Sequence, residues 1–565
     1  MLSKKDLDEQ LKKAHRTAEE NDAKRRAETL GFPYLDLISV RVPTELKALE
    51  IVKEPEARKA RLAPLQLIRK KLVIAVFDPR EKEAAAIIEE LKKKYELEIH
   101  IASLSGLEHG WSYYRFVTEE AKEITGKVDI DETRLNDLLL KIKTLSELTK
   151  EFEEFKSPLT SQLLEIILGG SMGLKASDIH LEPTEEFGIV RYRIDGLLHT
   201  AYDKFALHNY KSVIMRIKLL SNLKLNITDE PQDGRFTIGL KDRDIEIRTS
   251  IIPSEFGETV VMRLLDPLAL KVNLEDLGWR KDDLVIVKAQ IDRPNGLILN
   301  TGPTGSGKTT TLYAFLKNVT TPEIKVITVE DPVEYHIAGI SQTQVNPDAG
   351  YTFADGLRSI LRQDPDIILI GEIRDKETAE IALNAALTGH LVFSTLHTND
   401  SVGAIPRFLD LGAKPNILAP ALTLIIAQRL VRVLCKVCKV KREPTTQESE
   451  AIKRFLEGLP ARVDKTPYAT PSFHTAKGCE ACGGLGYRGR TSIFELFEVT
   501  DPIKEAIFRN PSEMELFTLA KKQGMVTMQE DGMLKVILGS TSVDEVERTT
   551  GVVPWLHNTD TPAGK

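Results

Sequence analysis

The pattern of apolar and polar positions divides this chain into segments of different type. Between Leu30 and Ser103 the apolar runs LVIAV and LEIHIA flank a charged, helix-like stretch, which predicts a strand, a helix and a strand of a small α/β domain. The first 30 residues are charged and helix-prone, as in a solvated or fraying helix. Residues 115–157 are again highly charged, and we expect a helical connector there.

A second domain is expected to begin near Pro158 with the amphipathic helix LTSQLLEIILGGSMGL, followed by short alternating strands. The pairs Asp195-Gly196 and Asp233-Gly234 separate apolar runs as hairpin turns or tight bends do. From about Leu274 to Arg432 strand and helix patterns alternate, which is typical of a parallel sheet covered by helices. Cysteine, glycine and loop residues follow, and helix-like segments close the chain.

A chain of 565 residues is too long for one hydrophobic core, so we expect several domains. The predicted fold class is α/β. The predicted parts are an N-terminal domain (1–114), a charged helical linker (115–157), a second N-terminal domain (158–270), a domain with a parallel sheet (271–432), a four-cysteine subdomain (433–499) and a C-terminal helical region (500–565).

Composition narrows the class of partner. The 84 acidic and 77 basic residues give a net charge of -7, so no general basic field attracts nucleic acid or anionic lipid, and we expect no nucleic-acid partner. The N-terminus MLSKKDLDEQ lacks the apolar core of a signal peptide. The longest apolar stretch, residues 417–427, contains a proline and is much shorter than the roughly 20 residues of a membrane span. We therefore expect a cytoplasmic chain without a membrane span.

The most specific motif is GPTGSGKTT, a complete GxxxxGK[ST] loop entered from the apolar run Leu297-Ile298-Leu299 and followed by a helix-like stretch. Such a loop directs several backbone N–H groups, an ammonium and a hydroxyl at one point, which suits a nucleoside triphosphate with magnesium. The predicted binding residues are Gly302, Pro303, Thr304, Gly305, Ser306, Gly307, Lys308, Thr309 and Thr310.

Hydrolysis needs carboxylates beside this loop, and two predicted strands end in them. Glu330 and Asp331 end one strand, and Glu372 ends the next. The carboxyl ends of parallel strands meet at one crevice, where one carboxylate can hold magnesium through water and another can orient the attacking water. The alternative is that these acids only cap helices. The division of labour between the two glutamates stays open.

Two histidines bracket a further predicted strand, in the sequence GHLVFSTLHTND. His390 precedes the strand and His397 follows it, close to Thr395 and Thr398. A lone histidine is usually an ordinary core or surface residue. This arrangement instead favours an edge that senses phosphate, with His397 the stronger candidate.

All four cysteines of the chain occur in two CxxC pairs, Cys435-Cys438 and Cys479-Cys482. Each pair can hold one side of a metal ion, and four thiolates complete the tetrahedral shell of a structural zinc site. Disulfides are the alternative, but a cytoplasmic chain keeps its thiols reduced. The sequence therefore predicts a zinc site.

Four motifs in their order along the chain carry a family resemblance. GPTGSGKTT, TVEDPVEY, LRQDPDIILIGEIRD and GHLVFSTLHTND resemble the secretion ATPase superfamily of type II secretion and type IV pilus assembly. Upstream, SDIHLEP, RYRIDG and PQDGR are similar to its second N-terminal domain. The resemblance implies a RecA-like P-loop domain with a parallel sheet, a PAS-like α+β domain before it, a small N-terminal α/β domain, a zinc subdomain and C-terminal helices.

The resemblance also implies roles for individual residues. Lys308 and Thr309 would bind phosphate and magnesium, Glu330 would be the catalytic residue and Glu372 the carboxylate of the second strand. Arginines of the second domain would stabilise charge on the transferred phosphoryl group, as a guanidinium from a neighbouring domain or subunit does. Four arginines lie in the matching region: Arg191, Arg193, Arg216 and Arg235. Arg216 and Arg235 are the preferred candidates for reaching the nucleotide.

For the whole protein, the resemblance implies a ring, usually of six subunits, that powers a filament-assembly machine at the inner membrane through a platform protein. The first domain would dock on a membrane-anchored partner, and residues 1–28 lack the paired motif with which some relatives bind cyclic di-GMP. The zinc subdomain favours assembly or secretion over pilus retraction, but pilus extension and type II secretion both stay open. A nucleic-acid translocase and a nucleotide-gated scaffold without turnover are the competing hypotheses.

Overall fold

The computed structural model describes residues 4–38, 44–116, 127–128, 132–155, 160–240, 243–268 and 272–557. The chain divides into two compact units between Asp266 and Pro267. The first unit holds the two predicted N-terminal domains, and the second holds the phosphate loop and the cysteines. In the described parts, no helix combines the length and the apolar composition needed to cross a membrane.

The first domain is built on a three-stranded sheet in the order β1-β2-β3. β2 and β3 run parallel and are connected through α4, which confirms the predicted order of strand, helix and strand, while β1 pairs antiparallel with β2. The elements are α1 (Lys4–Leu30), α2 (Leu46–Leu49), α3 (Glu54–Lys59), β1 (Leu62–Ile68), β2 (Lys71–Val76), α4 (Lys82–Lys92), β3 (Glu96–Ile101) and α5 (Leu104–Trp111).

Helix α1 confirms the prediction of a helix near the N-terminus, but its second half is anchored. Ala23 and Ala27 are buried, and the Glu20 carboxylate accepts a hydrogen bond from Ser103 Oγ at 2.7 Å. This half of α1 therefore belongs to the core of the first domain, which the charged composition of the segment conceals.

The second domain contains a seven-stranded sheet in the order β4-β8-β9-β10-β5-β6-β7. Only the short β4–β8 pair is parallel. Its elements are β4 (Lys127–Val128), α6 (Glu132–Lys141), α7 (Leu145–Glu154), α8 (Thr160–Gly173), β5 (Asp178–Pro183), β6 (Phe187–Ile194), β7 (Leu197–Ala206), α9 (Leu207–Leu220), β8 (Gln232–Gly239), β9 (Asp244–Ser254) and β10 (Gly257–Leu265).

The described part of the predicted connector packs into this second domain. Helices α6 and α7 lie so close to α8 that a Cβ atom at Gly170 would come within 2.6 Å of Leu148 Cδ1, and one at Gly169 within 3.0 Å of Leu138 Cβ. Leu135, Leu138 and Leu148 are buried at this contact, whereas Leu140 is exposed. The second domain therefore begins before Pro158.

Of the two predicted turns, one is confirmed and one is wrong. Asp195 and Gly196 join β6 to β7 with φ angles of 47° and 89°, the left-handed conformation of a two-residue hairpin turn. Asp233 and Gly234 instead lie inside β8. A Cβ atom at Gly234 would come within 2.5 Å of the Ser221 carbonyl oxygen, so close backbone packing accounts for this glycine.

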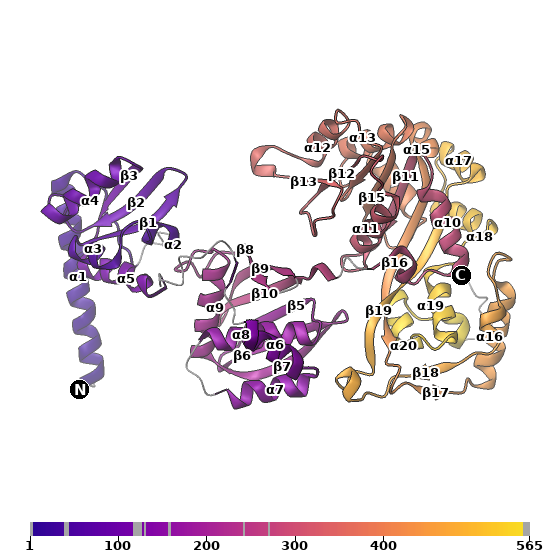
Figure 1. Cartoon of the computed structure of the whole chain (residues 1–565), viewed down its shortest axis with the longest axis horizontal. Helices are drawn as coiled ribbons and strands as arrows, with labels where there is room; N and C mark the ends of the chain where they lie inside the picture. The colour runs from indigo at the N-terminus through magenta and orange to yellow at the C-terminus, as the bar shows by residue number, and fades with distance from the viewer. Residues whose placement is uncertain are drawn as a thin grey trace. The chain divides into compact units, whose positions relative to one another are not determined.

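The second unit contains a seven-stranded sheet in the order β13-β12-β14-β15-β11-β16-β19, visible in Figure 1. All of its neighbouring pairs are parallel except β16–β19, which confirms the predicted parallel sheet. Its strands are β11 (Gly296–Thr301), β12 (Val326–Glu330), β13 (Ser341–Gln344), β14 (Ile367–Ile370), β15 (Leu391–Leu396), β16 (Leu422–Leu434) and β19 (Tyr487–Glu498).

Helices cover both faces of this sheet, and β11 is buried throughout. Leu297 and Leu299 join one hydrophobic cluster and Ile298 joins the other, as the alternation of side chains along a strand requires. The helices of this part are α10 (Lys281–Ile291), α11 (Lys308–Val319), α12 (Phe353–Ile360), α13 (Lys376–Leu387), α14 (Ala404–Asp410) and α15 (Pro415–Ala421).

The four-cysteine segment is an excursion from the main sheet. β16 extends past the predicted domain end at Arg432, and β19 returns beside it in an antiparallel pair. Between them lie β17 (Val440–Arg442), α16 (Thr446–Gly458) and β18 (Phe473–Thr475). The predicted C-terminal helices follow as α17 (Asp501–Phe508), α18 (Glu513–Lys522), α19 (Met528–Ile537), α20 (Val543–Thr550) and α21 (Pro554–His557).

Candidate functional site

The phosphate loop connects the end of β11 to the start of α11. Gly302, Gly305 and Gly307 have φ angles of 149°, 79° and 92°, in the region that favours glycine. β16 packs directly behind the loop, because a Cβ atom at Gly302 would come within 2.6 Å of the Gln428 carbonyl oxygen and one at Gly307 within 2.8 Å of Gln428 Nε2. The glycine spacing therefore serves both the turn and this close packing.

Lys308 is the first residue of α11, and its side chain folds back over the loop. Its Nζ donates to the carbonyl oxygens of Gly302 at 2.7 Å and Pro303 at 3.1 Å. Burial lowers the pKa of Lys308 to about 8, the charge of Glu372 opposes that shift and the charge of Arg429 adds to it. An ammonium at a helix N-terminus that donates to carbonyl oxygens is suited to receive an anion.

The other polar residues of the loop differ in exposure. Thr309 and Thr310 are exposed, whereas Ser306 is buried and its hydroxyl has no hydrogen-bond partner among the described residues. The exposed hydroxyl of Thr309, next to Lys308, is the one that a magnesium ion on the phosphates could reach. The residues present thus fit a magnesium nucleotide.

Glu330 ends β12 and is almost fully buried, with 4% of its surface exposed. Its carboxylate accepts hydrogen bonds from the Tyr313 hydroxyl, from Thr328 Oγ1 at 2.5 Å and from Gln342 Nε2 at 3.2 Å. Burial and the neighbouring charge of Glu330 raise the pKa of Tyr313, so this phenol stays a donor. Donors from α11, β12 and β13 thereby fix the orientation of the carboxylate.

Glu372 follows β14 at the same edge of the sheet as the phosphate loop. It forms an ion pair with Arg374, and His397 Nε2 lies 3.3 Å from Glu372 Oε2. His397 follows β15, and the next residue, Thr398, donates its backbone N–H to Thr301 Oγ1 at 2.9 Å. The structure therefore brings Glu372 and His397 to the loop edge, as the sequence predicts.

His390 lies at the other end of β15 and contradicts the expectation that it senses phosphate. Its carbonyl accepts from Gly296 N at the start of β11, whereas the loop follows the end of β11. A strand rises about 3.3 Å per residue, so the length of β11 separates the two edges by about 20 Å. The His390 ring contacts the Ala385 carbonyl at the end of α13 instead.

Gln428 and Arg429 on β16 are polar residues that the sequence analysis missed. Gln428 is buried behind the loop, where its Oε1 accepts from Asn300 Nδ2 and from Thr311 Oγ1, both at 2.9 Å. Arg429 lies beside the loop backbone. The available signal was the pair Gln-Arg directly after the apolar run LIIA of the same strand, where a buried polar residue needs partners.

The four arginines predicted to reach nucleotide belong to the first unit, whereas the loop belongs to the second. Arg191 pairs with Glu182, and Arg193 lies 3.5 Å from Asp178 Oδ2. Arg235 is on β8 with a side chain 73% exposed, and Arg216 is on α9. Their role at the nucleotide stays a prediction.

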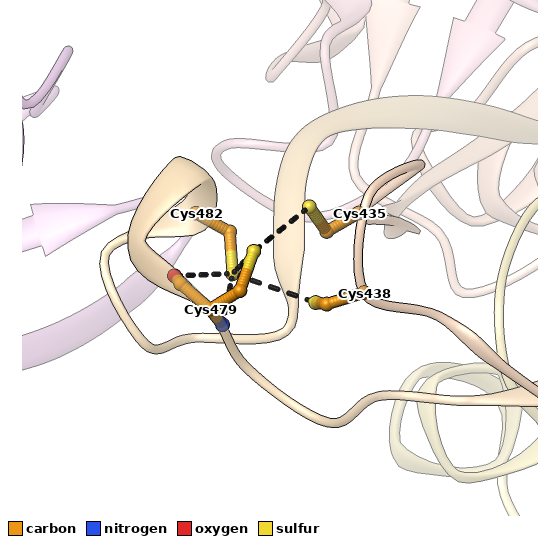
Figure 2. A group of neighbouring side chains, drawn as sticks. All are labelled: Cys435, Cys438, Cys479 and Cys482. Atoms are coloured by element: carbon orange, nitrogen blue, oxygen red, sulfur yellow. Dashed lines mark hydrogen bonds between the residues drawn. The ribbon is translucent and has the colours of Figure 1, made fainter.

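The four cysteines converge from the two arms of the excursion, with their sulfur atoms facing one another (Figure 2). Sγ–Sγ distances are 3.9 Å for Cys435–Cys479, 3.8 Å for Cys438–Cys482 and 3.8 Å for Cys479–Cys482. These distances exclude disulfides in this structure. A tetrahedral zinc shell with Zn–S bonds of about 2.3 Å has sulfurs about 3.8 Å apart, so the cluster fits such an ion.

Backbone donors support this cluster. Cys482 Sγ accepts from the backbone N–H groups of Cys479 at 3.2 Å and Gly486 at 3.1 Å. Burial alone would raise the pKa of the Cys482 thiol, but these hydrogen bonds lower it to about 7. The thiolate is the form that binds metal.

Comparisons with known proteins cover both units. A family model described as "Type II/IV secretion system protein" matches residues 153–548, and an "MshEN domain" model matches residues 30–114. Type II secretion system protein E of Pseudomonas aeruginosa is 43% identical over 76% of this chain and 82% of its own length. The type IV pilus assembly ATPase PilB of Myxococcus xanthus is 37% identical over 92% of this chain and 89% of its own.

Solved structures bear on the fold alone. The Legionella pneumophila ATPase DotB aligns with a TM-score of 0.50 at 20% identity, over 70% of this chain and 97% of that one. The expected absence of a cyclic dinucleotide site in the first domain stays a prediction.

The family model spans more than half of the chain, including the loop, Glu330, Glu372 and the cysteines. This protein therefore belongs to the type II/IV secretion system protein family, in agreement with the resemblance that its motifs carry.

Proposed function

We propose that this protein is an ATP-hydrolysing motor that drives type IV pilus assembly or assembly of the type II secretion pseudopilus. The carrying observation is the convergence of a complete phosphate loop, Lys308, Glu372 and His397 at one edge of a parallel sheet in a chain of this family. Relatives of both kinds match at similar identity, so both processes stay within the proposal.

The residues of the loop, Gly302 to Thr310, would hold the triphosphate through backbone N–H groups and the Lys308 ammonium. A bound magnesium ion would neutralise charge on the phosphates, with the Thr309 hydroxyl and, through water, Glu372 as its protein contacts. His397, paired with Glu372, would respond to the γ-phosphate from the end of β15.

Glu330 would orient the water that attacks the γ-phosphoryl group. A carboxylate offers about four acceptor positions, and Tyr313, Thr328 and Gln342 occupy three of them. The remaining position would accept a hydrogen bond from the attacking water. Because the three protein donors hold the carboxylate still, that water would be positioned before the reaction begins.

At the level of the assembly, we propose a homo-oligomeric ring of six subunits on the cytoplasmic side of the inner membrane. Arg216 and Arg235 of the PAS-like second domain would reach a bound nucleotide and stabilise charge on the transferred group. The ring would act on an inner-membrane platform protein, and the N-terminal domain would dock on a membrane-anchored partner. We propose no nucleic-acid partner.

The four cysteines would hold a structural zinc ion. Cys435, Cys438, Cys479 and Cys482 supply a complete set of thiolates, so no coordination position is left for a substrate. The ion would stabilise the excursion between β16 and β19.

Steady-state ATP hydrolysis by Lys308→Ala tests the proposal. We expect turnover to be abolished, with Lys317→Ala as a control because this lysine is exposed on the same helix. Substantial ATP hydrolysis by Lys308→Ala would contradict the assignment. ATP binding without turnover by the wild-type protein would favour a nucleotide-gated scaffold, and strong stimulation by DNA would favour a translocase.

A further inference from the structure

Arg429 is placed beside the phosphate loop by the pairing of β16 with β11. Thr301, the last residue of β11, pairs with Ala427, so β16 continues along the loop for its next two residues. Gln428 points into the buried layer behind the loop, and Arg429 points to the other side. A Cβ atom at Gly302 would come within 3.1 Å of Arg429 Nη1, so the guanidinium touches the start of the loop.

Among the residues that the structure describes, the partners of this guanidinium are backbone carbonyls. Nη2 donates to the Asn399 carbonyl oxygen at 3.0 Å, and Nη1 makes a longer contact of 3.4 Å with the Gln428 carbonyl oxygen. In the part of the chain that the structure describes, no carboxylate forms an ion pair with Arg429, and Asp400 and Glu495 act on it only over longer distances. Burial is the main influence on this residue, and it lowers the pKa of Arg429.

Two other arginines of this unit form ion pairs instead. Arg374 forms an ion pair with Glu372, and Arg358 forms one with Glu377. Arg429 and Lys308 are instead two cations at the same loop, and both donate to carbonyl oxygens. Holding two like charges close together in a half-buried place is unfavourable unless an anion lies between them.

We propose that Arg429 donates a charge-assisted hydrogen bond to a phosphate oxygen of the nucleotide held by the loop of its own subunit. This inference rests on the proposed function. The guanidinium has further N–H groups beyond the two that contact Asn399 and Gln428, so it can bind phosphate without releasing these carbonyls. Arg429 thereby supplies a positive charge from the same unit as the loop, in addition to any charge that Arg216 and Arg235 bring from the first unit.

The test is nucleotide binding by Arg429→Gln and Arg429→Lys, measured as the dissociation constants of magnesium ATP and of inorganic tripolyphosphate. A hydrogen bond to a charged group contributes about 1.5 to 3 kcal/mol, so Arg429→Gln raises the dissociation constants of both ligands by about 10-fold or more. The dissociation constants of Arg429→Lys fall between those of Arg429→Gln and the wild type, since lysine keeps the positive charge but lacks the planar guanidinium. Arg407→Gln, on exposed α14 surface, is the matched control and binds both ligands normally.

Wild-type affinity of Arg429→Gln for both ligands overturns the inference. The inference is also overturned if Arg429→Gln lowers the melting temperature of the nucleotide-free protein without changing either dissociation constant. That result is expected of a residue that only stabilises the fold through its hydrogen bond to the Asn399 carbonyl. The tripolyphosphate arm separates contact with phosphate from contact with the nucleoside: a loss confined to ATP also overturns the inference. Failure of the wild-type protein to bind ATP contradicts the proposed function itself, whereas normal binding by both proteins contradicts only the role of Arg429.

Discussion

Strand β16 borders both the phosphate loop and the cysteine cluster, and the polar groups of these two sites have different kinds of partner. β16 passes behind the loop and ends directly before Cys435. At the loop, Lys308 and Arg429 are cations that rest on carbonyl oxygens. At the cluster, the sulfurs face one another, and Cys482 already accepts two backbone N–H groups.

This difference separates an exchangeable ligand from a resident one. A site whose cations donate to neutral carbonyl oxygens can bind and release an anion without disrupting the fold. A site whose four ligands are complete gives its ion no open position, so it serves stability. The comparison predicts that changes at the loop alter turnover, whereas changes around the cluster alter folding.

The largest effect is expected from Cys482→Ser. Losing one of four thiolates should abolish stoichiometric zinc binding and lower the free energy of unfolding by several kcal/mol, since structural zinc binds with about 10 to 16 kcal/mol. Elemental analysis and urea unfolding measure the two effects. Val437→Ala, an exposed residue between two of the cysteines, is the control. Full zinc content in Cys482→Ser would refute the description of the cluster.

The second largest effect is expected from Glu330→Gln, which should change ATP turnover and leave the cysteine cluster intact. Removing the charge that orients water should lower kcat by about 10²- to 10³-fold, or about 3 to 4 kcal/mol, while the dissociation constant of ATP stays within about 2-fold. Glu505→Gln, on the exposed side of α17, is the control. Weakened ATP binding together with an unchanged kcat would place Glu330 in binding, and the proposed mechanism would fail.

Glu545→Gln probes an ion pair that joins α20 to β16 near the cysteine cluster. Burial alone would raise the pKa of Glu545, but hydrogen bonds from Arg432 and Arg548 lower it from 4.5 to about 2. A carboxylate with a lowered pKa stabilises the fold above its unfolded value of about 4.5, and this contribution is lost as the pH falls toward 2. We expect Glu545→Gln to cost about 3 kcal/mol at neutral pH.

Urea unfolding of both proteins between pH 7 and pH 3 measures this effect. The difference between wild type and Glu545→Gln should shrink below pH 4.5, where the Glu545 carboxylate of the unfolded chain begins to bind a proton while that of the folded protein stays charged. A difference that stays constant over this range would show that Glu545 acts through packing rather than charge. The ATP affinity of the variant should equal that of the wild type.

The smallest effect is expected from Tyr313→Phe, which removes one of the three donors that hold Glu330. A lost hydrogen bond of this kind is worth about 1 kcal/mol, so kcat should fall about 5-fold with little change in ATP affinity. Single-turnover hydrolysis separates chemistry from product release. A wild-type rate in Tyr313→Phe would mean that Thr328 and Gln342 orient the carboxylate without help.

Sequence reasoning succeeded where the signal is local. The loop of Gly302 to Thr310 and the two CxxC pairs are short motifs whose geometry follows from spacing, and the structure brings each set together. The apolar periods likewise predicted the parallel sheet, because strands buried on both faces leave a clear pattern.

Failures occurred where the outcome depends on distant parts of the chain. Gly234 resembles a turn in sequence, but it is there because the Ser221 backbone packs against it. His390 precedes β15, whereas the end of β15 lies at the phosphate loop, because β15 runs parallel to β11. Arg429 escaped notice because its place depends on the pairing of β16 with β11, more than a hundred residues earlier in the chain.

The most direct test of the contrast is one preparation of wild-type protein, passed by gel filtration into magnesium-free buffer and assayed for ATP hydrolysis and bound zinc. The account predicts no turnover until magnesium is added back, full turnover afterwards, and about one zinc ion per chain throughout. Turnover without magnesium, or loss of zinc in the same step while turnover persists, would contradict the assignment of an exchangeable site at Lys308 and a resident site at Cys482.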